Sequence, residues 1–376
     1  MKNLSLDIQL IIECSQHIPN KKKIKDLISN IEDWYAFIDL AYAHGVFPLV
    51  YKELKSYETE IPQDVLQTMK TDNMSIVKQN MLMSAELIKV MKILEENNIE
   101  ALAFKGPTLA QMAYGDITLR QYMDLDILVN KKDIYTTYKL LLNNYTRDIE
   151  RSESQEKLWF KYAHDLALTA KNNVHVEFHW QMLDSDHPIN LENINFFQNT
   201  HQIKINNYPI SVISNEEFLI YLCVHGSKHL YERLEWIVDI DRFINFQKID
   251  WKKFDNLIKD KNYQKFVYLG LYMANFLFGT KIGISEYKNN NDIQKVTSHI
   301  FNLWQKNSDF TNKDSIRYML KLFSSTLDKI YYIHKVYLKP TFTEYWYIDL
   351  PKPLYFLYYP LRQYLLMKKY FSNKNK

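Results

Sequence analysis

Glycine and proline are scarce in this chain of 376 residues, which contains only 7 glycines and 10 prolines. Average usage of these two residue types would be about 12% of a chain. The shortage excludes the glycine-rich phosphate loops of the Rossmann and Walker type. Each glycine that is present therefore becomes informative.

Cysteine and long apolar runs are also lacking. The 2 cysteines, Cys14 and Cys223, build neither a disulfide framework nor a cysteine-based zinc site, and they indicate a reducing compartment. No apolar run approaches the ~18 residues that a membrane-spanning helix needs. The N-terminus brings in Asp7 early and has no secretory signal pattern. We therefore expect a soluble, cytoplasmic protein without a transmembrane segment.

The chain also lacks a large excess of positive charge. The chain has 47 Lys and Arg against 44 Asp and Glu, a formal net charge of +3. This balance argues against a charge-driven nucleic-acid partner, which normally needs a strongly basic domain. With 47% hydrophobic and 24% charged residues, the chain has the composition of a folded globular protein.

The spacing of apolar residues divides the chain into three regions. Residues 1–97 repeat at helical intervals, residues 98–213 alternate with the period of strands, and residues 214–376 return to helical spacing. The predicted fold class is therefore α+β, with a small mixed sheet between N-terminal and C-terminal helical regions. Asn172 and Asn173 predict a tight hairpin in the middle region, and Ser214 with Glu217 predicts a capping box at the start of the last.

Asp124 and Asp126 stand two residues apart in a predicted strand whose other face is apolar. Both carboxylates project to the same side, roughly 7 Å apart along the strand. A divalent cation between them would remove the cost of two adjacent like charges. A solvated edge strand is the alternative interpretation of an isolated motif of this kind.

Basic residues precede the two aspartates. Lys105 and Gly106 end a predicted strand and open a short helix, whose exposed amides would favour a phosphate. Arg120 places a guanidinium at the mouth of the aspartate strand, with a fork geometry suited to phosphate oxygens. A plain turn is the alternative for Lys105 and Gly106 alone, but the order of strand, glycine turn, helix, arginine and paired aspartates favours nucleotide binding.

A later predicted strand carries Glu177 and His179 on its polar face. If this strand lies beside the aspartate strand, Glu177 completes three carboxylates. Two magnesium ions bridged in this way would hold the attacking and leaving oxygens of a phosphoryl transfer. A structural or ion-paired glutamate is the alternative.

The sequence around the lysine, the glycine turn, the arginine and the two aspartates resembles a bacterial family of nucleotidyltransferases in the DNA polymerase β superfamily. The similar segments are 102–116 and 120–129. Segments 176–180 and 223–239 are also similar, and the resemblance spans about residues 30–280. It implies a polymerase-β-type core over 98–213. Some members of the family are associated with the tailoring of ribosomal peptides such as lasso peptides, which implies a modified or phosphorylated peptide as acceptor.

The family's site residues transfer position by position. The resemblance implies that Gly106 is the glycine turn, that Asp124 and Asp126 are the paired aspartates and that Glu177 is the third carboxylate. The sequence departs from the wider superfamily at this turn, because it has Lys105 before Gly106 where Gly-Gly or Gly-Ser is common. The implied activity is transfer of a nucleoside monophosphate from a nucleoside triphosphate to a peptide or small-molecule acceptor, with Mg²⁺ as cofactor. A catalytically silent nucleotide- or peptide-binding protein and a metal-dependent phosphohydrolase are the alternatives.

Two further features lie in the last region. His225, Lys228, His229 and Arg233 form a polar stripe at helical spacing, which we interpret, together with His179, as a candidate acceptor-binding or phosphate-binding surface. A solvated helix face and a zinc pair are the alternatives. Aromatic residues are dense from 345 to 371, and this segment suits core packing, a substrate groove or attachment to a membrane surface.

Overall fold

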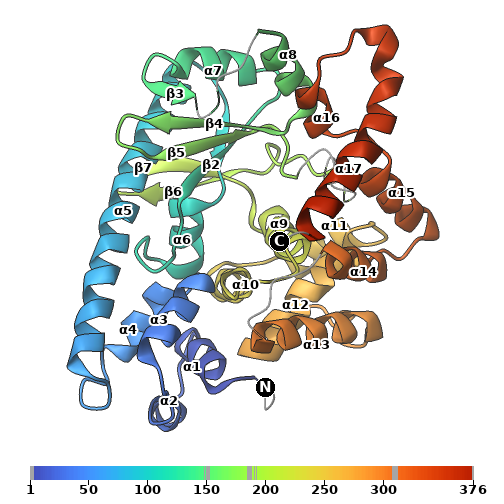
Figure 1. Cartoon of the computed structure of the whole chain (residues 1–376). Helices are drawn as coiled ribbons and strands as arrows, with labels where there is room; N and C mark the ends of the chain where they lie inside the picture. Colours follow the sequence, from blue (N-terminus) through green and yellow to red (C-terminus); the bar gives the residue numbers. More distant parts are fainter. Residues whose placement is uncertain are drawn as a thin grey trace.

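The N-terminal region of the computed structural model is helical, as predicted. The structure describes residues 4–147, 149, 153–183, 189, 191, 193–306 and 312–374. The first helices are α1 (Leu6–Cys14), α2 (Lys21–Ile28), α3 (Trp34–Ala43), α4 (Phe47–Leu54) and the long α5 (Gln63–Glu96). One face of α5 buries Met69, Met83, Leu87, Val90 and Leu94, at the spacing that an amphipathic helix requires. Helix α5 runs along one side of the molecule (Figure 1).

The middle region forms the mixed sheet that the alternating pattern predicts. Its strands are β1 (Ala101–Ala103), β2 (Asp124–Val129), β3 (Tyr145–Arg147), β4 (Asp165–Ala170) and β5 (His175–His179). Their spatial order is β1-β2-β5-β4-β3. Strand β5 pairs in parallel with β2 and brings Glu177 opposite Asp126. The α+β class is confirmed, and the condition on which a third carboxylate at Glu177 depended, that these two strands lie side by side, is met.

Short helices and turns connect the strands. Helices α6 (Gly106–Tyr114), α7 (Ile134–Leu141) and α8 (Glu153–Tyr162) follow β1, β2 and β3. Gly115 ends α6 in the left-handed conformation, with φ 69°, which glycine adopts without steric cost. Asn173 has φ 62° in the turn between β4 and β5, so the predicted Asn-Asn hairpin is confirmed.

A second sheet of two strands was not anticipated. Strands β6 (His201–Ile205) and β7 (Tyr208–Val212) pair in antiparallel fashion. Asn206 and Asn207 join them with φ values of 49° and 65°, the positive values that a two-residue hairpin turn needs. The Asn-Asn signal that predicted the first hairpin was therefore present here as well. The boundaries 97/98 and 213/214 remain a prediction about domains.

The C-terminal region begins with helices that pack under the sheet. They are α9 (Asn215–Lys228), α10 (Glu235–Phe246), α11 (Trp251–Ile258), α12 (Gln264–Phe278), α13 (Asn291–Lys306) and α14 (Asn312–Leu322). Helix α9 starts where predicted, but the capping box is wrong: the Ser214 side chain caps no amide, and Glu217 instead accepts a hydrogen bond from Lys253. The paired charge satisfies Glu217 in its buried position.

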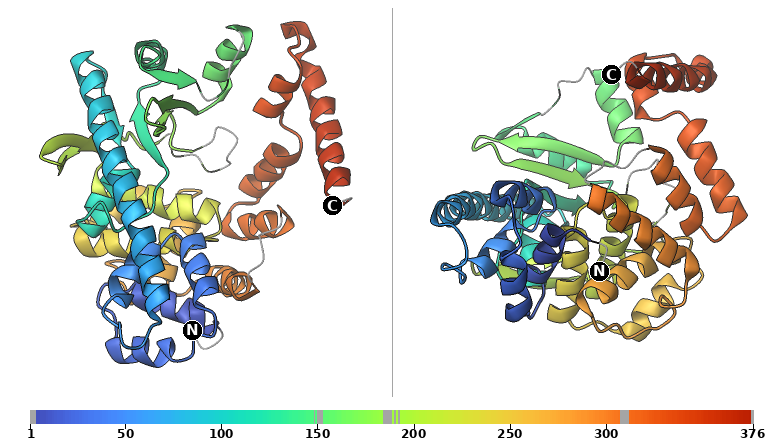
Figure 2. Two further views of the ribbon diagram at one scale, coloured as in Figure 1. Left: turned by 60° about the vertical axis from the view of Figure 1, so that its left-hand side comes forward. Right: turned by 60° about the horizontal axis from the view of Figure 1, so that its bottom comes forward.

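The last elements form an arm beside the rest of the molecule. They are α15 (Thr326–Tyr337), α16 (Phe342–Tyr347), the 3₁₀-helix η1 (Lys352–Leu357) and α17 (Tyr358–Lys374). We call residues 326–374 the C-terminal arm. In both views of Figure 2, α17 lies apart from the strands of the sheet. Among the described residues, no helix has both the length and the apolar character needed to cross a membrane.

Candidate active site

The paired aspartates lie on β2 with their side chains on the same side of the sheet, as the alternation of a strand requires. Asp126 is only 2% exposed, while Asp124, at the start of the strand, is half-buried. The neighbours Leu125 and Ile127 are in the hydrophobic core. The apolar side of β2 therefore fixes the strand and holds both carboxylates on the opposite face.

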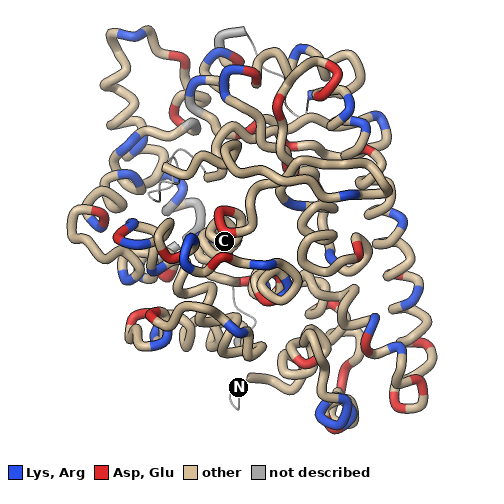
Figure 3. Tube along the Cα trace, turned by 180° about the vertical axis from the view of Figure 1, so that it is seen from behind, with Lys and Arg blue, Asp and Glu red and all other residues tan. Residues whose placement is uncertain are grey.

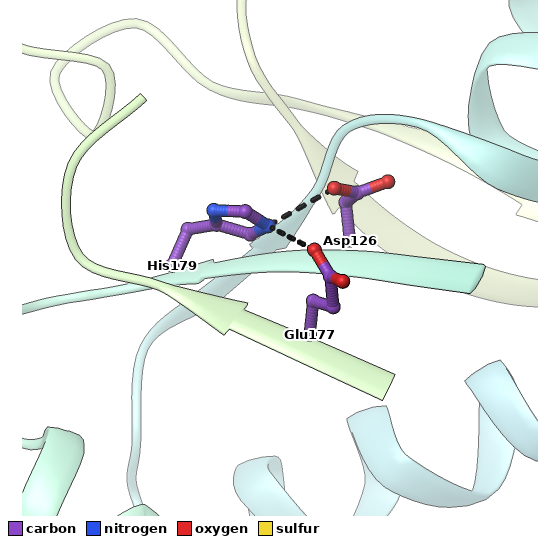
Figure 4. A group of neighbouring side chains, drawn as sticks. All are labelled: Asp126, Glu177 and His179. Atoms are coloured by element: carbon purple, nitrogen blue, oxygen red, sulfur yellow. Dashed lines mark hydrogen bonds and ion pairs between the residues drawn. The ribbon is translucent and has the colours of Figure 1, made fainter. Parts of the chain in front are cut away.

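Strand β5 adds two more side chains to this face (Figure 4). His179 Nε2 lies 3.0 Å from Asp126 Oδ1 and 3.4 Å from Glu177 Oε2. Ligand atoms of Asp126, Glu177 and His179 all lie within 4.8 Å of one another. The structure thus brings His179, which the sequence assigned to acceptor or phosphate binding, into the carboxylate cluster. Asp124 is on the same face but is not a member of this closest group.

Lys105 approaches the cluster from the N-terminal boundary of α6. Its Nζ lies 3.1 Å from Asp126 Oδ1, 5.6 Å from the ring centroid of Phe104 and 6.0 Å from that of Tyr221 on α9. Burial alone would lower the pKa of Lys105, but attraction to Asp126 outweighs this effect and raises the pKa. Lys105 therefore remains a cation inside the site.

The carboxylates and His179 titrate far from their ordinary ranges. Burial and repulsion from Asp126 raise the pKa of Asp124 to about 6. Burial also opposes ionisation of Asp126, but Lys105 and the hydrogen bond from His179 overcome it and lower its pKa. Burial lowers the pKa of His179, whereas hydrogen bonds to Asp126 and Glu177 raise it, with a net value of about 9. Such opposed shifts within one cluster are typical of functional sites.

The residues present fit a divalent metal ion. Asp126 Oδ2 is buried and has no hydrogen-bond partner among the described residues, although a buried carboxylate oxygen normally has one. The donor set is two carboxylates and one imidazole, with a further carboxylate on Asp124. Carboxylate oxygens suit Mg²⁺ and Mn²⁺, and an imidazole nitrogen favours Mn²⁺ or another transition ion over Mg²⁺.

Gly106 makes the turn that brings Lys105 to the site. It has φ +54°, and a Cβ atom at this position would lie 3.2 Å from the carbonyl oxygen of Asp124. Gly106, Pro107 and Thr108 are buried, and Thr108 donates its amide to the Lys105 carbonyl. The turn is therefore packed against β2, and phosphate binding by the Gly106 amide remains a prediction.

We expect Gly106→Ala to impair the site more than the fold. The substitution forces a side chain into a left-handed conformation and against the Asp124 carbonyl, at a cost of about 1–3 kcal/mol. Thermal unfolding should register this modest loss, while nucleotide and metal binding should fall more steeply because Asp124 is displaced. Gly279→Ala is the matched control, since Gly279 has a similar φ of +70° but no atom within 4 Å of the place that a Cβ would take. Equal effects of both substitutions on ligand binding would contradict this interpretation.

Arg120 is not at an open strand mouth, which corrects the sequence interpretation. It is 7% exposed, and its Nε and Nη2 donate to Asp239 of α10 at 2.9 Å each. Its Nη1 donates to the Gln121 carbonyl, and Tyr114 donates its hydroxyl to the same Asp239 carboxylate at 2.7 Å. The guanidinium thus joins the loop before β2 to α10, and Tyr114 of α6 meets it at the same carboxylate.

The stripe on α9 reaches the site through His225. Tyr221 is next to Lys105, and its hydroxyl oxygen lies 3.5 Å from Nδ1 of His225. The His225 ring in turn contacts the rings of His229 and Trp236. Burial lowers the pKa of His225 well below its usual range, so this histidine adds no positive charge to the stripe. Arg233 pairs with Glu235 at 2.9 Å. The roles predicted for His225, Lys228, His229 and Arg233 in binding remain predictions.

Two residues of the site region were missed by sequence reasoning. Tyr221 has no local signal, because it lies in an apolar helical stretch and reaches Lys105 and Phe104 only through the packing of α9. Asp239 ends one of the segments on which the family resemblance rests, but its charge was not assigned to Arg120, which lies 119 residues earlier. A pairing at this separation has no signature in a single sequence.

Comparison with known proteins places this arrangement in a family. No curated protein sequence matches the chain. Among solved structures, one that is similar is the crystal structure of an antigenic nucleotidyltransferase-like protein from Paracoccidioides brasiliensis, at 13% identity and a TM-score of 0.36, covering 55% of this chain and 97% of that chain. A family model described as uncharacterised nucleotidyltransferase matches residues 30–279. Because this match covers more than half of the sequence, the chain belongs to that nucleotidyltransferase family.

Proposed function

We propose that the protein transfers a nucleoside monophosphate from a nucleoside triphosphate to an acceptor. The single observation that carries the proposal is the register of β2 and β5, which sets Glu177 opposite Asp126 and so gathers three carboxylates on one face. Membership of the nucleotidyltransferase family supports the same reaction class. In this reaction an acceptor oxygen bonds to the α-phosphorus, the bond between the α-phosphorus and its bridging oxygen breaks, and pyrophosphate leaves.

The proposed metal ligands are Asp126, Glu177 and His179, with Asp124 on the same face for a second ion. A bound divalent cation supplies charge neutralisation on the phosphates and lowers the pKa of a bound hydroxyl. Glu177 is half-buried and has two alternative roles. It either binds the metal or, as a general base, takes the proton from the acceptor group. Imidazole ligation makes Mn²⁺ a good alternative to the Mg²⁺ predicted from the sequence.

Lys105 is the proposed phosphate-binding cation. It is half-buried beside Asp126 and near the Tyr221 ring, where a positive charge acts on phosphate oxygens with less screening by water than at the open surface. Arg120 is left out of the proposed phosphate site because its guanidinium is bound to Asp239. The acceptor carries a hydroxyl, phosphate or carboxylate, and a ribosomal peptide is one candidate.

The product distinguishes the proposed function from its alternatives. The full chain is incubated with Mg²⁺ or Mn²⁺ and each of four α-labelled nucleoside triphosphates, with and without extract of its source cell. Pyrophosphate together with label on an acceptor is expected, and Lys105→Met should lower the rate by about 100-fold or more because a charge on the phosphates is lost. Orthophosphate as the sole released phosphate would identify a phosphohydrolase. Nucleotide binding without any turnover would identify a silent binder.

A further inference from the structure

Large apolar side chains are exposed on the C-terminal arm far more than elsewhere. Of the 27 exposed large hydrophobic side chains in the described chain, 16 lie in the arm, which is 49 of the 376 residues. Core packing, one sequence interpretation of this aromatic segment, therefore accounts for only part of it. An exposed apolar surface of this density is typical of an interaction site.

The exposed residues follow the faces of two helices. On α15 they recur at helical spacing, with Leu327 76%, Ile330 58% and Tyr337 44% exposed. On α17, Tyr364 is 55% and Met367 60% exposed, and Lys368 and Lys369 follow directly and are also exposed. Each helix thus has an apolar outer face, and on α17 that face is flanked by lysines. This combination is found in helices that lie in a membrane interface.

Internal contacts hold the arm together as one unit. Arg362 of α17 donates to Glu344 of α16 at 3.2 Å and to the Val336 carbonyl of α15 at 3.0 Å. Tyr358 donates its hydroxyl to the Ile348 carbonyl. These polar contacts link α15, α16 and α17, while the side chains of the exposed apolar faces remain accessible.

The charge of the arm identifies the kind of partner. Residues 326–374 contain eight Lys and Arg against three Asp and Glu, a net charge of +5, while the rest of the chain is slightly acidic. Figure 3 shows Lys and Arg distributed along the arm. Two copies of this surface would repel each other, which disfavours a dimer through the arm. Aliphatic residues such as Leu327 and Ile330 contribute little to nucleic-acid binding, which uses aromatic stacking and cations.

We propose that the C-terminal arm docks on the surface of an anionic lipid bilayer. The aliphatic and aromatic side chains of α15 and α17 enter the boundary between headgroups and acyl chains, where tyrosine is favoured. Lys352, Lys368 and Lys369 are exposed and meet the negative headgroups. The protein lies on the membrane without spanning it, and this docking is independent of the proposed transfer reaction.

Vesicle sedimentation of the full chain tests the proposal. Vesicles of phosphatidylcholine with 30% phosphatidylglycerol are compared with vesicles of phosphatidylcholine alone. The affinity for the anionic vesicles is expected to be at least tenfold higher than for the neutral ones. It should fall as the salt concentration rises, because salt screens the attraction between lysines and anionic headgroups. Failure to bind the anionic vesicles, or equal binding to both, would overturn the proposal.

Two pairs of matched variants locate the contact. Lys368→Glu with Lys369→Glu should reduce the affinity at least tenfold, whereas Lys21→Glu with Lys22→Glu makes the same charge change on the exposed start of α2 and should have little effect. Tyr364→Ser with Met367→Ser should also weaken binding, in contrast to Met74→Ser with Met81→Ser on α5, where the side chains are 63% and 49% exposed. Circular dichroism and light scattering verify the fold and the monomer. Equal losses in arm and control variants, or a dimer that only the arm variants dissociate, would contradict docking through the arm.

Discussion

Asp126→Asn is expected to abolish divalent-metal binding and to reduce nucleotidyl transfer by at least about 10³-fold. Asp126 is the most buried of the three carboxylates, and it supplies both the oxygen that meets Lys105 and His179 and the oxygen that has no partner among the described residues. The amide keeps the shape of the side chain but removes the negative charge that the metal needs. Titration calorimetry with Mn²⁺ and the pyrophosphate assay measure the two losses separately.

The same substitution also leaves Lys105, which is half-buried, and His179, which is buried, without their counter-charge. Its effect on folding must therefore be separated from its effect on the site. Glu177→Gln serves this purpose, because Glu177 is half-buried and contacts His179 at the longer distance of 3.4 Å. Glu177→Gln should lower the affinity for the metal and slow nucleotidyl transfer, while it should change the thermal unfolding temperature little. Asp39→Asn on the exposed side of α3 is the control for an aspartate outside the site. Wild-type metal affinity in both Asp126→Asn and Glu177→Gln would contradict the proposed metal site.

Local patterns predicted most of what positions the carboxylates. Alternation between Asp124 and Val129 identified a strand with two carboxylates on one face, and the Asn172-Asn173 turn identified the hairpin that carries Glu177. The neighbouring of the two strands was only a condition for a cluster of three carboxylates, and the pairing of Asp126 with Glu177 meets it. The strand and hairpin predictions succeeded because each depends on residues close together in sequence.

The partners of the charged residues could not be predicted in the same way. Lys105, Arg120 and His179 were all assigned to phosphate or acceptor binding because a positive residue near two aspartates favours that interpretation. The structure distributes them differently: Lys105 and His179 contact Asp126, while Arg120 turns toward α10. The partner of Arg120 lies 119 residues away in the sequence, and those of Lys105 and His179 lie 21 and 53 residues away. These contacts depend on how the elements pack, which the spacing of apolar residues does not specify. Burial likewise determines that His225 is neutral.

Arg120→Met is expected to destabilise the protein by about 3–5 kcal/mol, the usual cost of removing one partner from a buried ion pair. The substitution leaves the Asp239 carboxylate, 1% exposed, with only the Tyr114 hydroxyl as a side-chain donor among the described residues. Arg120→Lys should recover part of the loss, because an ammonium group keeps the charge but not the bidentate contact. Denaturant unfolding of the metal-free chain measures both variants.

A double variant separates this structural role from phosphate binding. Arg120→Met combined with Asp239→Leu removes both charges and should regain most of the lost stability, because a buried pair replaced by apolar side chains of similar size is often neutral. The loop before β2 is also held from α5 by Asn80, which donates to the carbonyls of Ile117 and Arg120, so the aspartates should keep their place in the double variant. Nucleotide affinity near the wild-type value would then follow, since the Arg120 guanidinium is buried and bound to Asp239. A loss of triphosphate affinity of tenfold or more in a double variant with restored stability would show instead that the guanidinium leaves Asp239 to bind phosphate.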